Sequence, residues 1–227
     1  MTRYFSTTAM AVSLTALCAV ATPASAACVA GGSATDPSLT CSGADIDPID
    51  DARDNLSVIF DATAAHVSPT GVPIALSGSD QSVDNSGLIE STDSGENAIE
   101  GTGPALTVTN SGTIRGGDRG IVLEDDADNF TLTNLSGGEI FARRQAVRLD
   151  DDFALTNTTI TNDGLIKSSD GRAIQSRGPG TTITNTGTLR GGEEVVEARE
   201  DFSLTNTGTI ALNGLEWDAG TKSWTND

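Results

Sequence analysis

Short stretches of alternating apolar and polar residues recur along most of this chain. In segments 106–109, 130–133, 182–184 and 202–205, apolar residues alternate with threonines or a serine. A period of two is typical of a β-strand with one buried face. We therefore expect strands whose aliphatic side chains face inward and whose threonines face outward.

An Asn-x-Gly-x phrase closed by Ile or Leu follows each strand of this kind. Glycine tolerates a positive φ and asparagine accepts a left-handed conformation, so the phrase predicts a tight turn from which the aliphatic residue starts the next strand. A further copy, from Asn134 to Ile140, carries two inserted residues. The regular copies comprise Asn85, Gly87 and Ile89; Asn110, Gly112 and Ile114; Asn162, Gly164 and Ile166; Asn185, Gly187 and Leu189; and Asn206, Gly208 and Ile210.

The closing aliphatic residue recurs at 89, 114, 140, 166, 189 and 210, in steps of 21 to 26 residues. A short apolar patch, such as 120–123 or 146–147, follows it within each unit. Two or three strands repeated at this period predict an all-β solenoid, a parallel β-helix of about six coils stacked about 4.8 Å apart. Leucine-rich repeats share the period but need a denser leucine frame than this chain has.

The first 26 residues have the features of a secretory signal peptide. Arg3 precedes an apolar run at 10–21, and Ala24-Ser-Ala26 forms a cleavage site, so we expect an exported chain that starts at Ala27. The run is too short for a transmembrane helix, and no later stretch reaches the roughly 20 apolar residues that a span needs. Lipidation of Cys28 is the alternative, but Ser25 stands where that signal needs an aliphatic residue.

The rest of the chain divides into three parts. Residues 27–55 are rich in Gly, Ser, Asp and Pro, which predicts an irregular N-terminal cap tied by a disulfide between Cys28 and Cys41. Residues 56–215 hold the β-helix repeats. Residues 216–227 form a C-terminal tail in which Trp217 and Trp224 either cover the last coil or lead into a further segment.

The phrases Asn110-Ser-Gly-Thr-Ile114 and Asn185-Thr-Gly-Thr-Leu189, behind a signal peptide in an acidic Gly/Thr/Asn-rich chain, resemble the passenger domains of bacterial autotransporters. The resemblance covers about residues 56–215. It implies a right-handed β-helix displayed on the outer membrane or released from the cell, often as an adhesin, toxin or protease. It also implies a C-terminal β-barrel translocator, which this sequence lacks, so we expect either the N-terminal part of a longer autotransporter or a short independent solenoid.

Thirty-two acidic residues against 13 basic ones, with a pI near 4.1, predict a strongly negative surface. Nucleic acid is therefore disfavoured as a partner. The acidic surface is explained either by solubility in a salty exterior or by divalent cation binding.

The register of the repeats predicts two charged columns. Glu100, the acidic runs at 124–126 and 150–152, Arg177 and the pair at 200–201 all fall ten to twelve residues after a reference aliphatic residue. This column is either a row of solvated turns or a Ca²⁺ site, and we expect no other cofactor. The Ca²⁺ ligands would be Asp125, Asp126 and Asp151.

The second column directly follows the reference aliphatic residue and contains three cations, which either offset neighbouring carboxylates or bind an anionic glycan or a protein ligand. Its members are Glu90, Arg115, Phe141, Lys167, Arg190 and Ala211.

Catalytic motifs are weak in this chain. His66, the only histidine, is expected in a loop or at the edge of a coil, and 92–95 lacks the first glycine of a serine-protease nucleophile motif. We therefore expect a structural and adhesive module with no catalytic residues. The alternative is a carbohydrate-active β-helix enzyme of the polysaccharide lyase or hydrolase type, which would use carboxylates at strand spacing.

Overall fold

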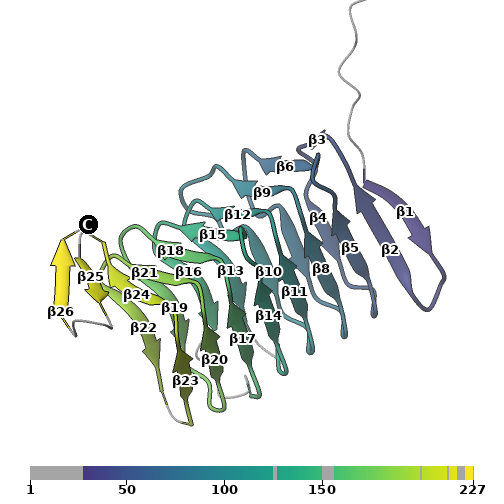
Figure 1. Cartoon of the computed structure of the whole chain (residues 1–227). Helices are drawn as coiled ribbons and strands as arrows, with labels where there is room; N and C mark the ends of the chain where they lie inside the picture. Colours follow the sequence, from purple (N-terminus) through teal and green to yellow (C-terminus); the bar gives the residue numbers. More distant parts are fainter. Residues whose placement is uncertain are drawn as a thin grey trace, which may run out of the picture.

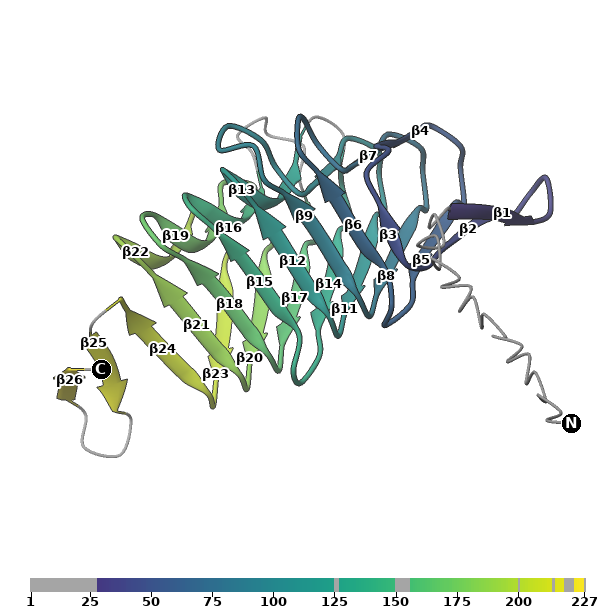
Figure 2. The same cartoon turned by 90° about the horizontal axis from the view of Figure 1, so that it is seen from above.

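The chain winds into a right-handed parallel β-helix (Figures 1 and 2), as the sequence predicts. The computed structural model describes residues 28–124, 127–149, 156–199 and 201–213, and the backbone of 215–218 and 223–226. These residues contain no α-helix, and therefore no α-helix that could span a membrane. The expected signal peptide lies outside the described residues.

Three sheets form the walls of the helix. Sheet A contains, in spatial order, β1 (Cys28–Gly32), β2 (Pro37–Cys41), β5 (Ser57–Phe60), β8 (Ser82–Asn85), β11 (Thr107–Asn110), β14 (Thr131–Asn134), β17 (Thr159–Asn162), β20 (Thr182–Asn185) and β23 (Ser203–Asn206). Sheet B contains β3 (Ala44–Asp45), β6 (Ala65–Ser68), β9 (Leu88–Ser91), β12 (Thr113–Gly116), β15 (Glu139–Ala142), β18 (Leu165–Ser168), β21 (Thr188–Gly191), β24 (Thr209–Leu212), β25 (Leu215–Asp218) and β26 (Ser223–Asn226). Sheet C contains β4 (Ile49–Asp51), β7 (Ile74–Leu76), β10 (Ile99–Gly101), β13 (Arg119–Leu123), β16 (Gln145–Leu149), β19 (Arg172–Ser176) and β22 (Glu194–Ala198).

Each coil contributes one strand to sheet A, then one to sheet B, then one to sheet C. Strands β5 to β22 therefore make the six predicted coils. Equivalent residues lie above one another, as where Val108 pairs with Val83 on one side and Leu132 on the other. These aliphatic side chains are buried and the threonines between them are not, which confirms the predicted orientation.

The asparagine of the repeat does not take the left-handed conformation that we expected. From Asn85 to Asn185 it ends a sheet A strand with its side chain buried, and its Nδ2 donates to the Oδ1 of the equivalent asparagine in the next coil; Asn206, the last acceptor, is exposed. The same Nδ2 lies within hydrogen-bond distance of two backbone carbonyl oxygens, so the amide satisfies polar groups inside the coil. This asparagine ladder consists of Asn85, Asn110, Asn134, Asn162, Asn185 and Asn206, with Nδ2 to Oδ1 distances of 2.6–2.8 Å.

The glycine of the repeat serves close approach of backbones and not a positive φ. A Cβ on Gly112 would lie 2.1 Å from the carbonyl oxygen of Gly87, and one on Gly164 would lie 2.3 Å from that of Gly138. No side chain fits there, because each turn stacks directly on the turn of the preceding coil.

Left-handed residues lie instead at the corner where each coil enters sheet A. They have φ between 51° and 74° and recur once per coil. They are Asn55, Asp80, Ala105, Asn129, Asn157, Gly180 and Asp201.

The two ends of the rod differ from its coils. Strand β1 runs antiparallel to β2 and is joined to it by the predicted disulfide between Cys28 and Cys41. Strands β2, β3 and β4 already pair in parallel with β5, β6 and β7, so regular stacking starts inside the expected cap. At the other end β24, β25 and β26 form antiparallel pairs (Figure 1). In the pair of β25 and β26 the backbones of Trp217 and Trp224 lie opposite each other.

Candidate functional site

The corner between sheets B and C gathers arginines around one buried carboxylate. Asp118, in the turn between β12 and β13, is only 4% exposed. Its carboxylate lies 2.9 Å from Nη1 of Arg119 and 2.9 Å from Nη2 of Arg143, and 3.6 Å from Nη1 of Arg144. Three guanidinium groups therefore compensate one buried acid, and Arg143 and Arg144 remain about half exposed.

The next coils continue this charged corner. Arg172 Nε lies 2.7 Å from carboxylate oxygens of both Glu194 and Glu197. The hydrogen bond to Glu194 raises the pKa of Arg172 above its usual value, so this guanidinium stays charged. A hollow of about 240 Å³ lies beside it, lined by Arg144, Gln145, Asp170, Gly171, Arg172 and Glu193.

The predicted cationic column lies on the outer face of sheet B. Strand pairing places Arg115 between Glu90 and Phe141, and Lys167 between Phe141 and Arg190, which confirms the column. Arg115 Nη1 is 3.4 Å from Glu90 Oε1, and its guanidinium lies 6.0 Å from the centre of the Phe141 ring. We call the outer cations of sheet B and its following corner the basic patch: Arg115, Arg143, Arg144, Lys167 and Arg190.

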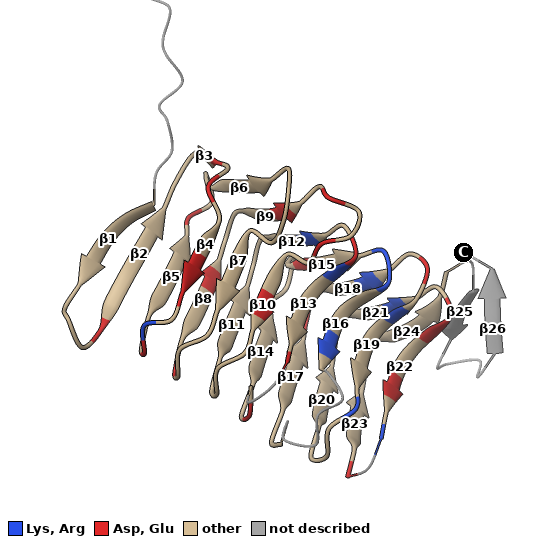
Figure 3. Cartoon of the chain, turned by 180° about the vertical axis from the view of Figure 1, so that it is seen from behind, with Lys and Arg blue, Asp and Glu red and all other residues tan. Residues whose placement is uncertain are grey.

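Charge is distributed unevenly along the rod (Figure 3). Residues 28–114 hold 13 Asp or Glu and a single cation, Arg53, whereas residues 115–213 hold 16 Asp or Glu and 10 Lys or Arg. The basic patch therefore lies on the later coils of an otherwise acidic rod, where it can attract an anion at short range.

The predicted acidic column is wrong for Glu100. This residue lies on β10 and pairs with Ala75 and Val122, so its column continues to Arg148 and Gln175 and not to the acidic runs. Counting from the reference aliphatic residue failed because the turns between strands differ in length. The proposed Ca²⁺ ligands Asp125, Asp126 and Asp151 lie outside the described residues, so that site stays a prediction.

His66 is not the loop residue that we expected. It lies on β6, is 1% exposed and pairs in register with Ile89, so it occupies the core position of the repeat aliphatic residue. The signal was present in the sequence, because His66 precedes Ile89 by 23 residues, within the range of the repeat period. We missed it because a polar residue stands where the phrase requires an aliphatic one.

Comparison of the chain with protein-family models, with curated proteins and with solved structures finds no match.

Proposed function

We propose that this protein is an exported structural and adhesive module, displayed at a cell surface or secreted, of the kind found in autotransporter passengers. The observation that carries the proposal is the continuous asparagine ladder inside an unbroken stack of coils. Such a stack holds its outer side chains at fixed spacing along a rod. Export rests on the signal-like first 26 residues.

Rigidity follows from the hydrogen bonds along the rod axis. Three ladders of backbone bonds cross every junction between the repeat coils, and from Asn85 onward a ladder of side-chain amides crosses as well. Bending the rod would separate several of these bonds on one side at once, so a rod of this kind suits a spacer or a stalk.

The adhesive part of the proposal rests on the basic patch. Its cations project from consecutive coils, whose strands lie about 4.8 Å apart, so the patch is a linear array of positive charge. An anionic polymer, such as a sulfated or carboxylated glycan, could contact several of these charges along its length. Asp118, the buried acid beside the patch, is bound by arginines, which suits it to organising them and not to acid catalysis.

Adhesion can be tested with beads that carry residues 27–227. We expect them to bind dextran sulfate and not unsubstituted dextran, with binding that weakens as salt rises. The combined variant Arg115→Gln, Lys167→Gln and Arg190→Gln should lose most of this binding.

A matched control changes the net charge equally on another face. Thr107, Thr159 and Ser203 are exposed on sheet A and lie on non-adjacent strands, so each can be replaced by Glu. This control should retain most of the binding. Equal losses in the two variants would show that only net charge matters and would remove the basic patch from the proposal.

A further inference from the structure

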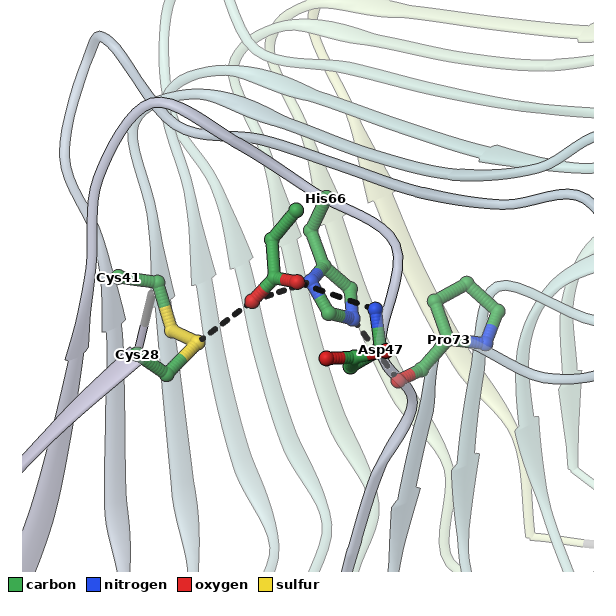
Figure 4. The surroundings of a disulfide bond; sticks show 6 residues. Cys28, Cys41, Asp47, His66 and Pro73 are labelled. Atoms are coloured by element: carbon green, nitrogen blue, oxygen red, sulfur yellow. Dashed lines mark hydrogen bonds and ion pairs between the residues drawn. A yellow bond between two sulfur atoms is a disulfide. The ribbon is translucent and has the colours of Figure 1, made fainter. Parts of the chain in front are cut away.

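The end of the rod near the disulfide holds a cluster of metal-binding atoms. Cys28 Sγ, a carboxylate oxygen of Asp45 and a ring nitrogen of His66 lie within 4.8 Å of one another. They come from β1, β3 and β6, and Figure 4 shows the disulfide and the His66 ring on either side of a carboxylate that contacts both. The strand register explains this meeting, because Asp45 pairs with His66 and Cys28 pairs with Cys41.

His66 presents a free lone pair to this cluster. Its Nε2 lies 3.2 Å from the carbonyl oxygen of Pro73, which can only accept, so Nε2 carries the hydrogen of the neutral ring. Nδ1 is then the unprotonated nitrogen. It is buried, has no hydrogen-bond partner among the described residues, and lies 3.9 Å from Asp45 Oδ2. Metal-bound histidines typically donate their other ring N–H to a backbone carbonyl in this way.

Asp45 is oriented in a similar manner. Its Oδ1 accepts a hydrogen bond from the backbone N–H of Asp47, which leaves Oδ2 turned toward His66 and Cys28. Cys28 Sγ lies 3.7 Å from Oδ2 but carries no hydrogen in the disulfide, so this contact is not a hydrogen bond.

The spacing suits a tetrahedral centre. Zinc bonds of about 2.0 Å to nitrogen or oxygen and about 2.3 Å to sulfur separate tetrahedral ligand atoms by about 3.3–3.5 Å. The observed separations are 3.7 Å for the sulfur–oxygen pair and 3.9 Å for the nitrogen–oxygen pair, which come within about 0.2 Å and about 0.6 Å of this geometry. Small side-chain rotations would close the difference.

We propose that the reduced chain binds a thiophilic divalent cation, Zn²⁺ above all, through Cys28 Sγ, Asp45 Oδ2 and His66 Nδ1, with the Cys41 thiolate as the fourth ligand. Cys41 Sγ is bonded to Cys28 Sγ in the oxidised chain, so reduction releases both sulfurs beside the other two ligands. The inference is independent of the adhesive function. The metal would hold β1 against the first coil before the disulfide forms.

A phosphine can reduce the disulfide between Cys28 and Cys41. The phosphine attacks the disulfide and water completes the step, giving two thiols and one phosphine oxide. The cation then replaces the two thiol protons, which pass to solvent. The disulfide and the metal site therefore exclude each other, because the metal binds the two cysteine thiolates and the disulfide contains neither.

The test is titration of residues 27–227 with Co²⁺, whose bond to thiolate gives a near-ultraviolet charge-transfer band. We expect one Co²⁺ per phosphine-reduced chain, displaced by Zn²⁺, and no band in the oxidised chain. His66→Ala and Asp45→Asn, both reduced, should each weaken binding at least about tenfold. Asp84→Asn, which removes an exposed carboxylate on sheet A, is the matched control and should bind normally.

A second variant guards against failure of the reduced chain to fold. Cys41→Ser leaves Cys28 as a permanent thiol, so this variant should bind Co²⁺ through one thiolate without any reductant, and Zn²⁺ should raise its Tm. Equal Co²⁺ affinity of reduced wild type and His66→Ala would overturn the proposal, even if His66→Ala lowers Tm. Such a result would mean that His66 contacts Asp45 in the folded chain but does not bind the metal.

Discussion

Buried asparagine amides join the coils of this rod, and each amide depends on its neighbours above and below. Asn162 donates to Asn185 Oδ1 at 2.7 Å and accepts from Asn134 Nδ2 at 2.7 Å. Removal of one amide therefore leaves buried polar groups unsatisfied on both sides.

We predict that Asn162→Ala lowers the free energy of unfolding by about 2–4 kcal/mol, because a buried donor and a buried acceptor each lose a partner. Urea unfolding followed by circular dichroism would measure the change. Thr161→Ala, one residue earlier and facing outward, should change stability by less than about 0.5 kcal/mol. Similar values for both variants would contradict a structural role of the ladder.

Ala105 is the residue least suited to its backbone. Its φ is 61°, at a corner where the other coils have Asn, Asp or Gly. The left-handed conformation costs a Cβ-bearing residue about 1–2 kcal/mol, and the extra freedom of glycine in the unfolded chain costs about 0.5–1 kcal/mol.

Ala105→Gly should therefore raise the free energy of unfolding by about 0.5–1 kcal/mol. Ala75→Gly, in strand β7, provides the opposite case and should lower it by about the same amount. Thermal melts of both variants would test the pair, and a loss of stability in Ala105→Gly would show that the corner carries no strain.

At the scale of the strand and turn, the sequence predicts features that depend on neighbouring residues within one coil, and it does not predict contacts between coils. The alternation in segments such as 182–184 predicts strand, orientation and stacking, because burial on one face imposes a period of two. The roles of Asn and Gly in the turn were misassigned from the sequence. Their side-chain amide and their missing Cβ meet atoms of other coils, and single-residue turn preferences carry no information about such contacts.

The stacked turns predict a sharp response to added volume. Gly164→Ala would place a Cβ 2.3 Å from the carbonyl oxygen of Gly138, so two backbones must separate, and we expect a loss of about 2–3 kcal/mol. A Cβ on Gly95 would meet nothing closer than 3.7 Å, so Gly95→Ala should be nearly neutral in the same unfolding experiment. Equal tolerance of both changes would contradict the close stacking.

The corner before sheet A also links coils through carboxylates. Asp54 Oδ1 accepts from both the backbone N–H and the hydroxyl of Ser79 in the next coil, at 2.9 Å and 2.8 Å. These hydrogen bonds, the backbone one first, lower the pKa of Asp54. A lowered folded-state pKa contributes stability that is present above the unfolded value of about 3.9 and is lost as the pH falls through the folded value.

Thermal melts between pH 7 and pH 2 should therefore show a constant contribution from Asp54 down to about pH 4 and a loss below it. In Asp54→Asn this part of the acid dependence should be absent. The same acid dependence in wild type and variant would show that the link to Ser79 has no energetic weight.

Across the whole molecule, negative charge opposes the compact rod. The chain has a formal net charge of −19, and stacking brings like charges of neighbouring coils together. We predict that Tm rises when NaCl is increased from about 20 mM to about 500 mM, because the Debye length falls below the spacing of these charges. A Tm that falls or stays constant would mean that ion pairs outweigh the repulsion.

The sequence predicts the architecture of the whole molecule where the repeat is regular, and it does not predict the contacts of coils in which the repeat is irregular. The solenoid, its six repeat coils and the disulfide were predicted, because each depends on a recurring or paired residue type. The cluster of Asp45 and His66 was not, since both residues replace the repeat aliphatic in coils that precede its first clear copy. The basic patch was predicted in part: its column follows from period, whereas Arg143 and Arg144 lie in a turn.

The asparagine ladder also bears on how the gene for such a rod can change length. Every internal rung offers the same donor on one side and the same acceptor on the other, so the ladder continues when a whole coil is removed or inserted. Removal of residues 162–184 would join Thr161 to Asn185 and bring the amides of Asn134 and Asn185 into contact without altering either neighbour. Duplication of the same segment would lengthen the rod by about 4.8 Å. In-frame gain or loss of whole coils is therefore the mutation that this architecture tolerates best, and reach is the property that such a mutation adjusts.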